Sequence, residues 1–108
     1  MALACAPAKQ SAVAPPIPGA PEVIVIATEM RFSPGEVVLP AREVNLTVRN
    51  TGSLPHDLTV PGLGIYLLVQ PGQAVTTGLR DLPRGRYDGQ CGIQGHAAAG
   101  MAVAITVE

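Results

Sequence analysis

Proline and glycine interrupt this chain so often that little room is left for a long helix. There are 11 Pro and 12 Gly among 108 residues. Both residues disfavour the interior of a helix, and no stretch of ten or more residues keeps a helical period between them. The apolar residues instead fall into short runs, which predicts strands joined by turns.

Eight short segments have the composition and alternation of β-strands. In the clearest one, residues 43–49, Val44, Leu46 and Val48 share one face and polar residues occupy the other. The segments are residues 23–27, 36–39, 43–49, 57–60, 65–69, 74–79, 86–91 and 101–107. About eight strands at fairly even spacing predict a single all-β domain, an antiparallel Greek-key β-sandwich.

The charge and composition argue against several classes of protein. The net charge is −1 at pH 7, and only 14% of the residues are charged. The arginines are scattered along the chain, so there is no basic footprint for nucleic acid. We find no apolar stretch of the length that spans a bilayer and no glycine-rich phosphate-binding motif.

Residues 1–21 are predicted to form a flexible, Pro/Ala-rich tail. Five prolines after Cys5 favour an extended spacer, partly in the polyproline II conformation. Leu3-Ala4-Cys5 resembles the end of a bacterial lipoprotein signal, although the apolar region before it is missing. A free thiol is the alternative. We therefore expect a domain at residues 22–108, in the periplasm or another extracytoplasmic space, with Cys5 as a candidate membrane tether.

The C-terminal part of the chain holds a group of soft metal-binding side chains. Cys91, His96 and Met101 follow one another in the segment CGIQGHAAAGM, and the only other histidine is His56. A thiolate and two imidazoles in a trigonal plane, with a weak axial thioether, form an electron-transfer copper site. These residues therefore predict one copper ion that alternates between Cu(I) and Cu(II).

The same residues also allow uses other than a copper electron carrier. Zinc also takes a cysteine and two histidines, but an open fourth position would leave Met101 without a role. A Cys91 nucleophile with His96 as its base would want a helix N-terminus or an oriented His–Asp pair, and no helix is predicted. The main alternative is a copper-binding protein for storage or delivery, with the same ligands but no redox cycling.

From about Met30 to its end, the chain resembles the cupredoxin family, especially the small plastocyanin-like members. The resemblance rests on Phe32-Ser33-Pro34, Val48 to Asp57, Pro71-Gly72-Gln73, Leu82 to Tyr87, and the spacing of Cys91, His96 and Met101. It implies a type 1 (blue) copper protein that carries electrons and is not an enzyme. The implied ligands are His56 and His96 through imidazole, Cys91 through thiolate and Met101 through its axial thioether.

The chain departs from the family pattern at two places near these ligands. Family members often have an aromatic residue before the cysteine, where this chain has Gly89 and Gln90. A glycine here is expected to weaken the strand and to mark a bulge. Many members have Asn where this chain has Asp57, whose backbone N–H is still expected to donate to the Cys91 sulfur.

The loop position of His96 predicts that it is the ligand closest to the surface and the exit for the electron. An apolar docking patch for redox partners is expected around it, made of Leu54, Pro55, Pro61, Leu63, Ala97, Ala98 and Ala99. A small patch suits transient partners, and the low net charge predicts a modest salt dependence of docking. We expect the protein to work as a monomer.

Overall fold

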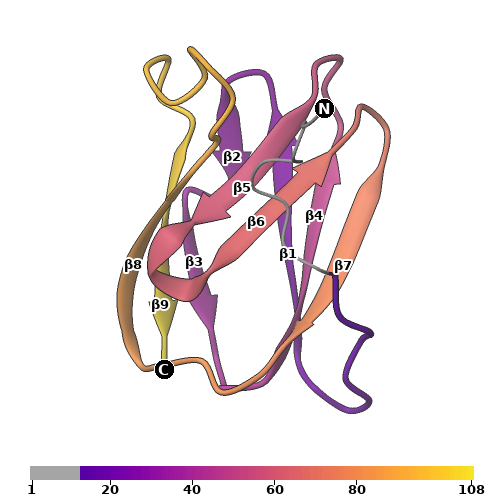
Figure 1. The fold of residues 1–108 in the computed structure, drawn as a ribbon, viewed down its shortest axis with the longest axis vertical. Coiled ribbons are helices and arrows are strands. Elements are labelled where there is room, and N and C mark those ends of the chain that lie inside the picture. The colour runs from indigo at the N-terminus through magenta and orange to yellow at the C-terminus, as the bar shows by residue number, and fades with distance from the viewer. Residues whose placement is uncertain (1–12) are drawn as a thin grey trace, which may run out of the picture.

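The computed structural model describes residues 13–108, which fold into two β-sheets packed face to face (Figure 1). The strands are β1 (Glu22–Thr28), β2 (Arg31–Ser33), β3 (Glu36–Leu39), β4 (Val44–Asn50), β5 (His56–Val60), β6 (Ile65–Val69), β7 (Ala74–Leu79), β8 (Gly85–Gln90) and β9 (Ala102–Val107), and a 3₁₀ turn, η1 (Pro61–Leu63), follows β5. One sheet has the order β2-β1-β4-β7 and the other β3-β9-β8-β5-β6. The predicted all-β sandwich is confirmed.

Eight of these strands overlap with the predicted segments, and β2 is the strand that the sequence did not reveal. β2 has only three residues and pairs with β1 through the turn at residues 29–30. Its central residue, Phe32, is 3% exposed and belongs to the core. A strand of this length is too short to show a period of two, so its only signal was one aromatic residue.

The sandwich is mixed, whereas the sequence predicted an antiparallel one. β1 runs parallel to β4, and β3 runs parallel to β9, while the other neighbours are antiparallel. In both parallel pairs the chain between the two partners crosses to the opposite sheet and returns, and such a crossover allows parallel pairing. Alternation within a single segment indicates a buried face but does not identify the neighbouring strand.

A single, mainly aliphatic core fills the space between the sheets. The alternation of β4 is confirmed, since Val44, Leu46 and Val48 are at most 2% exposed. From the facing sheet, the fully buried side chains of Leu58 and Leu67 join the same cluster. Removal of this apolar area from water is the main favourable term for so small a domain.

Gly89 in β8 fills a packing role and does not mark a bulge, contrary to the sequence prediction. The pairing of β8 with β9 is continuous from Gly85 opposite Val107 to Gln90 opposite Ala102. A Cβ atom at Gly89 would lie 2.9 Å from Cγ1 of Val103 and 3.2 Å from Cγ2 of Val60. The missing side chain therefore leaves space that aliphatic neighbours in the core occupy.

Residues 14–21, the last part of the predicted tail, pack against β4 and β7; we call them the strap. Ile17 is 7% exposed. The side-chain amide of Asn45 accepts a hydrogen bond from the Ile17 N–H (2.7 Å) and donates one to the Ile17 carbonyl (2.9 Å). The strap is thus attached to the sandwich, whereas the sequence suggested that residues 1–21 extend away from it.

The strap also approaches β7 closely. The N–H of Gly78 donates to the Ala14 carbonyl (3.2 Å), and the N–H of Ala14 donates to Oγ1 of Thr77 (3.0 Å). A Cβ atom at Gly78 would collide with the Pro15 carbonyl, so this approach requires a glycine. Cys5 lies outside the described residues, so the lipid tether and a domain boundary after residue 21 stay predictions.

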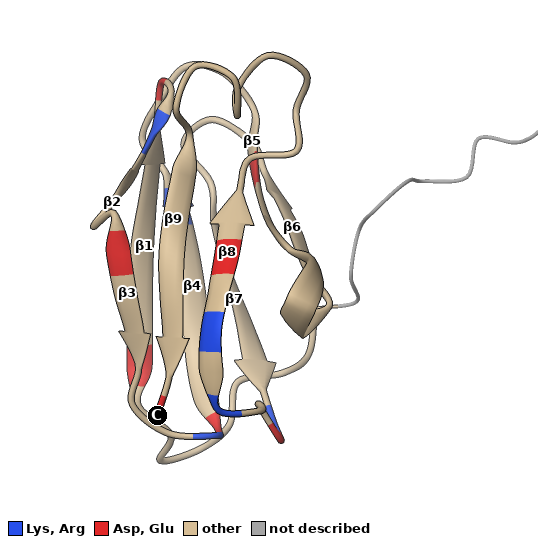
Figure 2. Cartoon of the chain, turned by 90° about the vertical axis from the view of Figure 1, so that its left-hand side faces the viewer, with Lys and Arg blue, Asp and Glu red and all other residues tan. Residues whose placement is uncertain are grey.

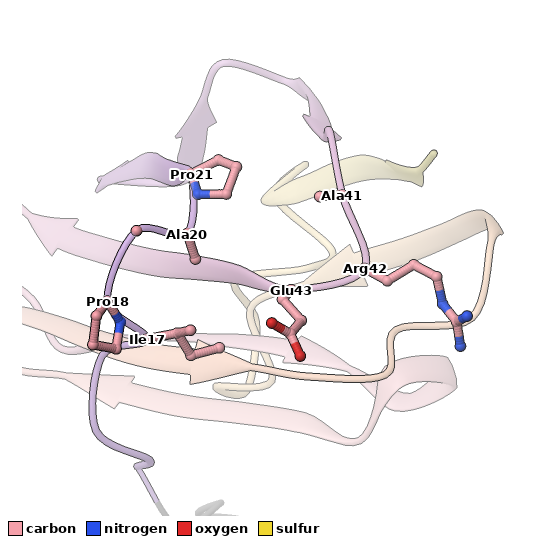
Figure 3. A pocket seen from close by; sticks show the side chains of 8 residues that line it. Ile17, Pro18, Ala20, Pro21, Ala41, Arg42 and Glu43 are labelled. Atoms are coloured by element: carbon pink, nitrogen blue, oxygen red, sulfur yellow. The ribbon is translucent and has the colours of Figure 1, made fainter.

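The surface of the described residues carries little charge, and a pocket lies beside the strap. Lys, Arg, Asp and Glu are dispersed, and the loop between β8 and β9 carries none of them (Figure 2). The pocket is lined by residues 17–21 and by Ala41, Arg42 and Glu43, which precede β4 (Figure 3). Within residues 13–108, no helix has the length and apolar character to cross a membrane.

The burial of Ile17 predicts that the strap stabilises the domain. Ile17→Ala is expected to lower the free energy of unfolding by about 2 kcal/mol, because it removes a buried aliphatic side chain. Val13→Ala is the control, since Val13 is 50% exposed and should change little. Urea unfolding of both variants measures the difference, and equal effects would show that the burial of the Ile17 side chain contributes no stability.

Candidate metal centre

The strand order brings three of the four predicted ligands to one end of one sheet. His56 is the first residue of β5, Cys91 directly follows β8, and Met101 directly precedes β9. β5 and β9 flank β8 and run antiparallel to it. Gln90, the last residue of β8, lies opposite Ala102, the first residue of β9, and opposite Thr59 of β5, so β5 extends past the end of β8 to His56. The Cys91 N–H donates to the Met101 carbonyl (3.1 Å), which extends the β8–β9 pairing by one step.

His96 lies in the loop that joins β8 to β9, and this loop is held by its own backbone. The His96 N–H donates to the Ile93 carbonyl (3.0 Å), and the His96 carbonyl accepts from the Met101 N–H (3.1 Å). Gly95 and Gly100 have φ values of 87° and 101°, which other residues rarely adopt. Glycine at these two positions lets the loop fold back and bring His96 toward Cys91 and His56.

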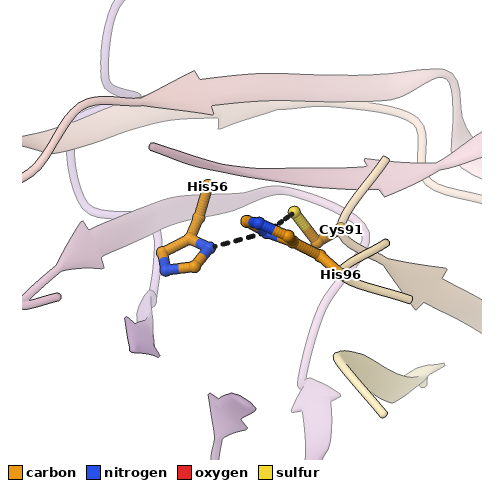
Figure 4. A group of neighbouring side chains, drawn as sticks. All are labelled: His56, Cys91 and His96. Atoms are coloured by element: carbon orange, nitrogen blue, oxygen red, sulfur yellow. Dashed lines mark hydrogen bonds between the residues drawn. The ribbon is translucent and has the colours of Figure 1, made fainter. Parts of the chain in front are cut away.

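His56, Cys91 and His96 converge within the protein (Figure 4). Nδ1 of His56 lies 3.2 Å from Nδ1 of His96, which in turn lies 3.3 Å from the Cys91 sulfur. The candidate ligand atoms of all three residues lie within 4.8 Å of one another. His56 and Cys91 are fully buried, and His96 is 8% exposed.

These three donor atoms suit a thiophilic metal ion. Each imidazole nitrogen without a proton, and the sulfur, offers a lone pair, and the buried lone pairs repel one another unless a proton or a cation lies between them. A cation that favours imidazole and thiolate ligands compensates all three together, which fits copper or zinc. The site can therefore hold a metal ion through His56, Cys91 and His96.

Met101, directly before β9, is fully buried in the same core cluster as Cys91. Its backbone pairs with two of the candidate ligands, since its carbonyl accepts from the Cys91 N–H and its N–H donates to the His96 carbonyl. The coordination of a metal ion by its thioether stays a prediction.

The surroundings of Cys91 set the protonation of its sulfur. Burial raises the pKa of the Cys91 thiol above its usual range, and the Asp57 N–H, which donates to the sulfur at 3.4 Å, offsets part of that effect. This hydrogen bond was expected from the sequence. A metal ion that binds the thiolate must displace the thiol proton, so binding releases a proton.

The Asp57 carboxylate holds the backbone beside Cys91. Its Oδ1 atom accepts a hydrogen bond from the Gly92 N–H (2.6 Å) and another from the Thr59 hydroxyl (2.8 Å). The carboxylate therefore links β5 to the residue after Cys91. The side-chain oxygen of an asparagine, which many family members have here, could accept the same two hydrogen bonds. Asp57 differs from that asparagine in its negative charge.

Asn50 shapes the loop that leads to His56. Its side chain is buried and donates to the carbonyls of Leu54 (2.8 Å) and Val69 (2.9 Å), while Oδ1 accepts from the Gly52 N–H (2.9 Å). An asparagine that binds the backbone two residues ahead is typical of a turn. The sequence indicated that a strand ends here but not that Asn50 connects the loop to β6.

Glu29 is a neighbour of the site that the sequence did not indicate. Its Oε1 atom lies 3.1 Å from Nε2 of His56, and the backbone N–H groups of Ser53 and Leu54 also donate to its carboxylate. The pKa of the Glu29 carboxyl lies below its usual range, chiefly because of the Ser53 N–H and then of the His56 side chain. Glu29 and His56 are 27 residues apart in the sequence, and no local pattern relates the two residues.

The loops around His96 form a smaller apolar surface than the sequence predicted. Leu54 is 40% exposed, and Ala98 and Ala99 are exposed close to His96 in the sequence. His96 is the most exposed of the four predicted ligands. Pro61 and Leu63 belong to η1, which follows the far end of β5. Five strand residues place η1 roughly 16 Å from His56, so the prediction was wrong for these two residues.

The chain matches the family model of the cupredoxin-like domain over residues 1–104. It belongs to the cupredoxin family. No curated protein matches the chain.

Solved structures share the fold at low sequence identity. Auracyanin B has a TM-score of 0.73 and 21% identity, with 93% of this chain and 96% of that chain covered. Reduced auracyanin from the photosynthetic bacterium Roseiflexus castenholzii has a TM-score of 0.69 and 18% identity, with 83% and 99% covered. A chain of a heme-copper terminal oxidase has a TM-score of 0.67 and 18% identity, with 100% and 78% covered.

The network around Asn50 predicts a loss of stability when its side chain is removed. Asn50→Ala leaves the carbonyls of Leu54 and Val69 without their donor, which is expected to cost about 1–3 kcal/mol in the free energy of unfolding. Thr51→Ala is the control, because Thr51 is exposed. Denaturant unfolding measures both variants, and an Asn50→Ala protein as stable as the control would contradict the assignment.

Proposed function

We propose that this protein is a type 1 copper protein that carries single electrons between redox partners. The convergence of Nδ1 of His56, Nδ1 of His96 and the Cys91 sulfur in a buried site carries the proposal. Met101 would add a weak axial thioether. Bound copper would supply reversible one-electron chemistry between Cu(I) and Cu(II).

The chain's own residues support this role by holding the donors in place. His56 and Cys91 are fixed at the ends of adjacent strands, and the loop of His96 is closed by backbone hydrogen bonds. Donor atoms that do not move between oxidation states keep the reorganisation on electron transfer small. The Asp57 N–H further holds the Cys91 sulfur and influences the potential of the site.

We propose a carrier and not an enzyme. The full burial of His56, Cys91 and Met101 leaves a substrate little access to these side chains, while the slightly exposed edge of His96 suits the passage of an electron. Auracyanin, one of the structures with this fold, was solved in a dithionite-reduced form, which supports redox chemistry on such a scaffold. Another chain with the fold belongs to a terminal oxidase, so the fold by itself does not distinguish a carrier from part of an enzyme.

We also propose an extracytoplasmic location, periplasmic or tethered to a membrane through a lipid on Cys5. Redox partners would dock on the surface beside His96, formed by Leu54, Pro55, Ala97, Ala98 and Ala99. We propose that the protein acts as a monomer.

Titration of the reduced, metal-free full chain with Cu(II) tests the function. We expect an intense blue or green band and a narrow copper hyperfine splitting in electron paramagnetic resonance, because a thiolate bound to copper produces both. Repeated reduction and oxidation should proceed without loss of copper, which separates a carrier from a storage or delivery protein. A pale product, or tighter binding of zinc, would contradict the proposal.

Matched variants separate the roles of the ligands. Cys91→Ser should abolish the band, whereas Cys5→Ser should leave it unchanged. Met101→Leu should keep the band but raise the reduction potential, because the lost thioether stabilises Cu(II) more than Cu(I). Met30→Leu is its control, and equal potentials for the two methionine variants would remove Met101 from the ligand set.

The docking surface is tested by electron self-exchange between copper-loaded copies, which needs no identified partner. Ala98→Asp places like charges against each other when two such surfaces meet, so the rate should fall at least about tenfold at low salt and recover at high salt. Val38→Asp is the control, with the same change of charge at a residue that is 50% exposed on β3. Equal rates for the two variants would argue for docking elsewhere.

A further inference from the structure

Glu29 connects the first sheet to the metal-binding end of the second. It directly follows β1, and its carboxylate accepts hydrogen bonds from the N–H of Ser53 (3.0 and 3.1 Å), the hydroxyl of Ser53 (3.2 Å) and the N–H of Leu54 (3.2 Å). The remaining contact is with Nε2 of His56 at 3.1 Å. The side chain of Glu29 is 39% exposed, while that of His56 is fully buried.

The chemistry of a carboxylate fixes the direction of the last of these contacts. An ionised carboxylate can only accept hydrogen bonds, so Nε2 of His56 must carry the proton that is shared with Glu29. A neutral imidazole has one N–H, and its other nitrogen then has a free lone pair. Figure 4 shows that this other nitrogen, Nδ1, faces His96 and Cys91.

We propose that Glu29 is a positioning residue, which selects the Nε2–H form of His56, holds its ring, and thereby keeps Nδ1 ready to bind the metal ion. It also places a negative charge at the outer edge of a ligand, which favours the more positive Cu(II) state over Cu(I). The second effect rests on the proposed function, whereas the first concerns the metal-free chain.

Gly52 makes this arrangement sterically possible. A Cβ atom at Gly52 would overlap with Oε1 of Glu29, the atom that contacts His56. Gly52 is not among the residues with positive φ, so alanine fits its backbone. Gly52→Ala should therefore displace the flexible carboxylate from His56 and leave the charge of the protein and all four predicted ligands unchanged.

The form of His56 is measured first, in the metal-free full chain, by ¹⁵N NMR of the imidazole nitrogens at a pH at which both histidines are neutral. We expect the wild type to carry the proton on Nε2 of His56. Glu29→Gln should keep this form, because the amide oxygen can still accept the bond, whereas Glu29→Ala and Gly52→Ala should give a mixture. Glu22→Gln is the matched control at the opposite end of β1, where Glu22 accepts one long bond from Thr47 (3.4 Å).

The metal-bound state is measured next, by Cu(II) affinity and reduction potential. Glu29→Ala and Gly52→Ala should weaken Cu(II) binding about 10- to 100-fold, as is typical when the partner of a metal-binding histidine is lost. Glu29→Gln should raise the potential relative to Glu22→Gln, since both variants lose one negative charge but only one loses it beside the site. Amide spectra verify that each variant is folded, and Glu29→Gln keeps the test valid if Glu29→Ala does not fold.

The outcomes separate this inference from the proposed function. Protonation on Nδ1 of His56 in the wild type, or variants at Glu29 and Gly52 that match Glu22→Gln in every measurement, would overturn the role of Glu29 even if the copper band is present. A wild type that shows the expected form of His56 but no copper band would overturn the proposed function and leave the positioning role in place.

Discussion

Two imidazole nitrogens and a sulfur face one another in the interior of this protein, within 4.8 Å and shielded from water. Lone pairs held so close inside a protein are unfavourable unless a proton or a metal ion lies between them. The rest of the fold maintains that arrangement. Three strand ends supply His56, Cys91 and Met101, and a loop closed by its own backbone adds His96.

The site depends on both sheets, although its predicted ligands come from the end of only one. Asn50, the last residue of β4, connects the loop before His56 to β6, and Glu29, after β1, contacts His56 itself. Each of these residues satisfies groups that would otherwise be buried without a partner. Separation of the two sheets would therefore remove the support of the ligands as well as the apolar core.

The sequence predicted those features whose signal lies within a short segment. Alternation in β4 indicated its buried face, and the kinds of side chain at Cys91, His96 and Met101 indicated soft metal chemistry. It could not predict the parallel pairing of β1 with β4 or the contact between Glu29 and His56, because both depend on which distant segments meet. The prediction of a bulge at Gly89 was wrong for the same reason, because the space beside Gly89 is filled by Val60 and Val103 from other strands.

The strap has a consequence for how copies of this protein behave beside one another. β7 is the last strand of its sheet, and such an edge normally exposes N–H and carbonyl groups that can pair with a strand of another molecule. The Gly78 N–H is already bound to Ala14, and Pro15 passes directly over the same glycine. A recombinant form that began at residue 22 would keep every predicted metal ligand but would expose this edge, and it would be prone to edge-to-edge aggregation.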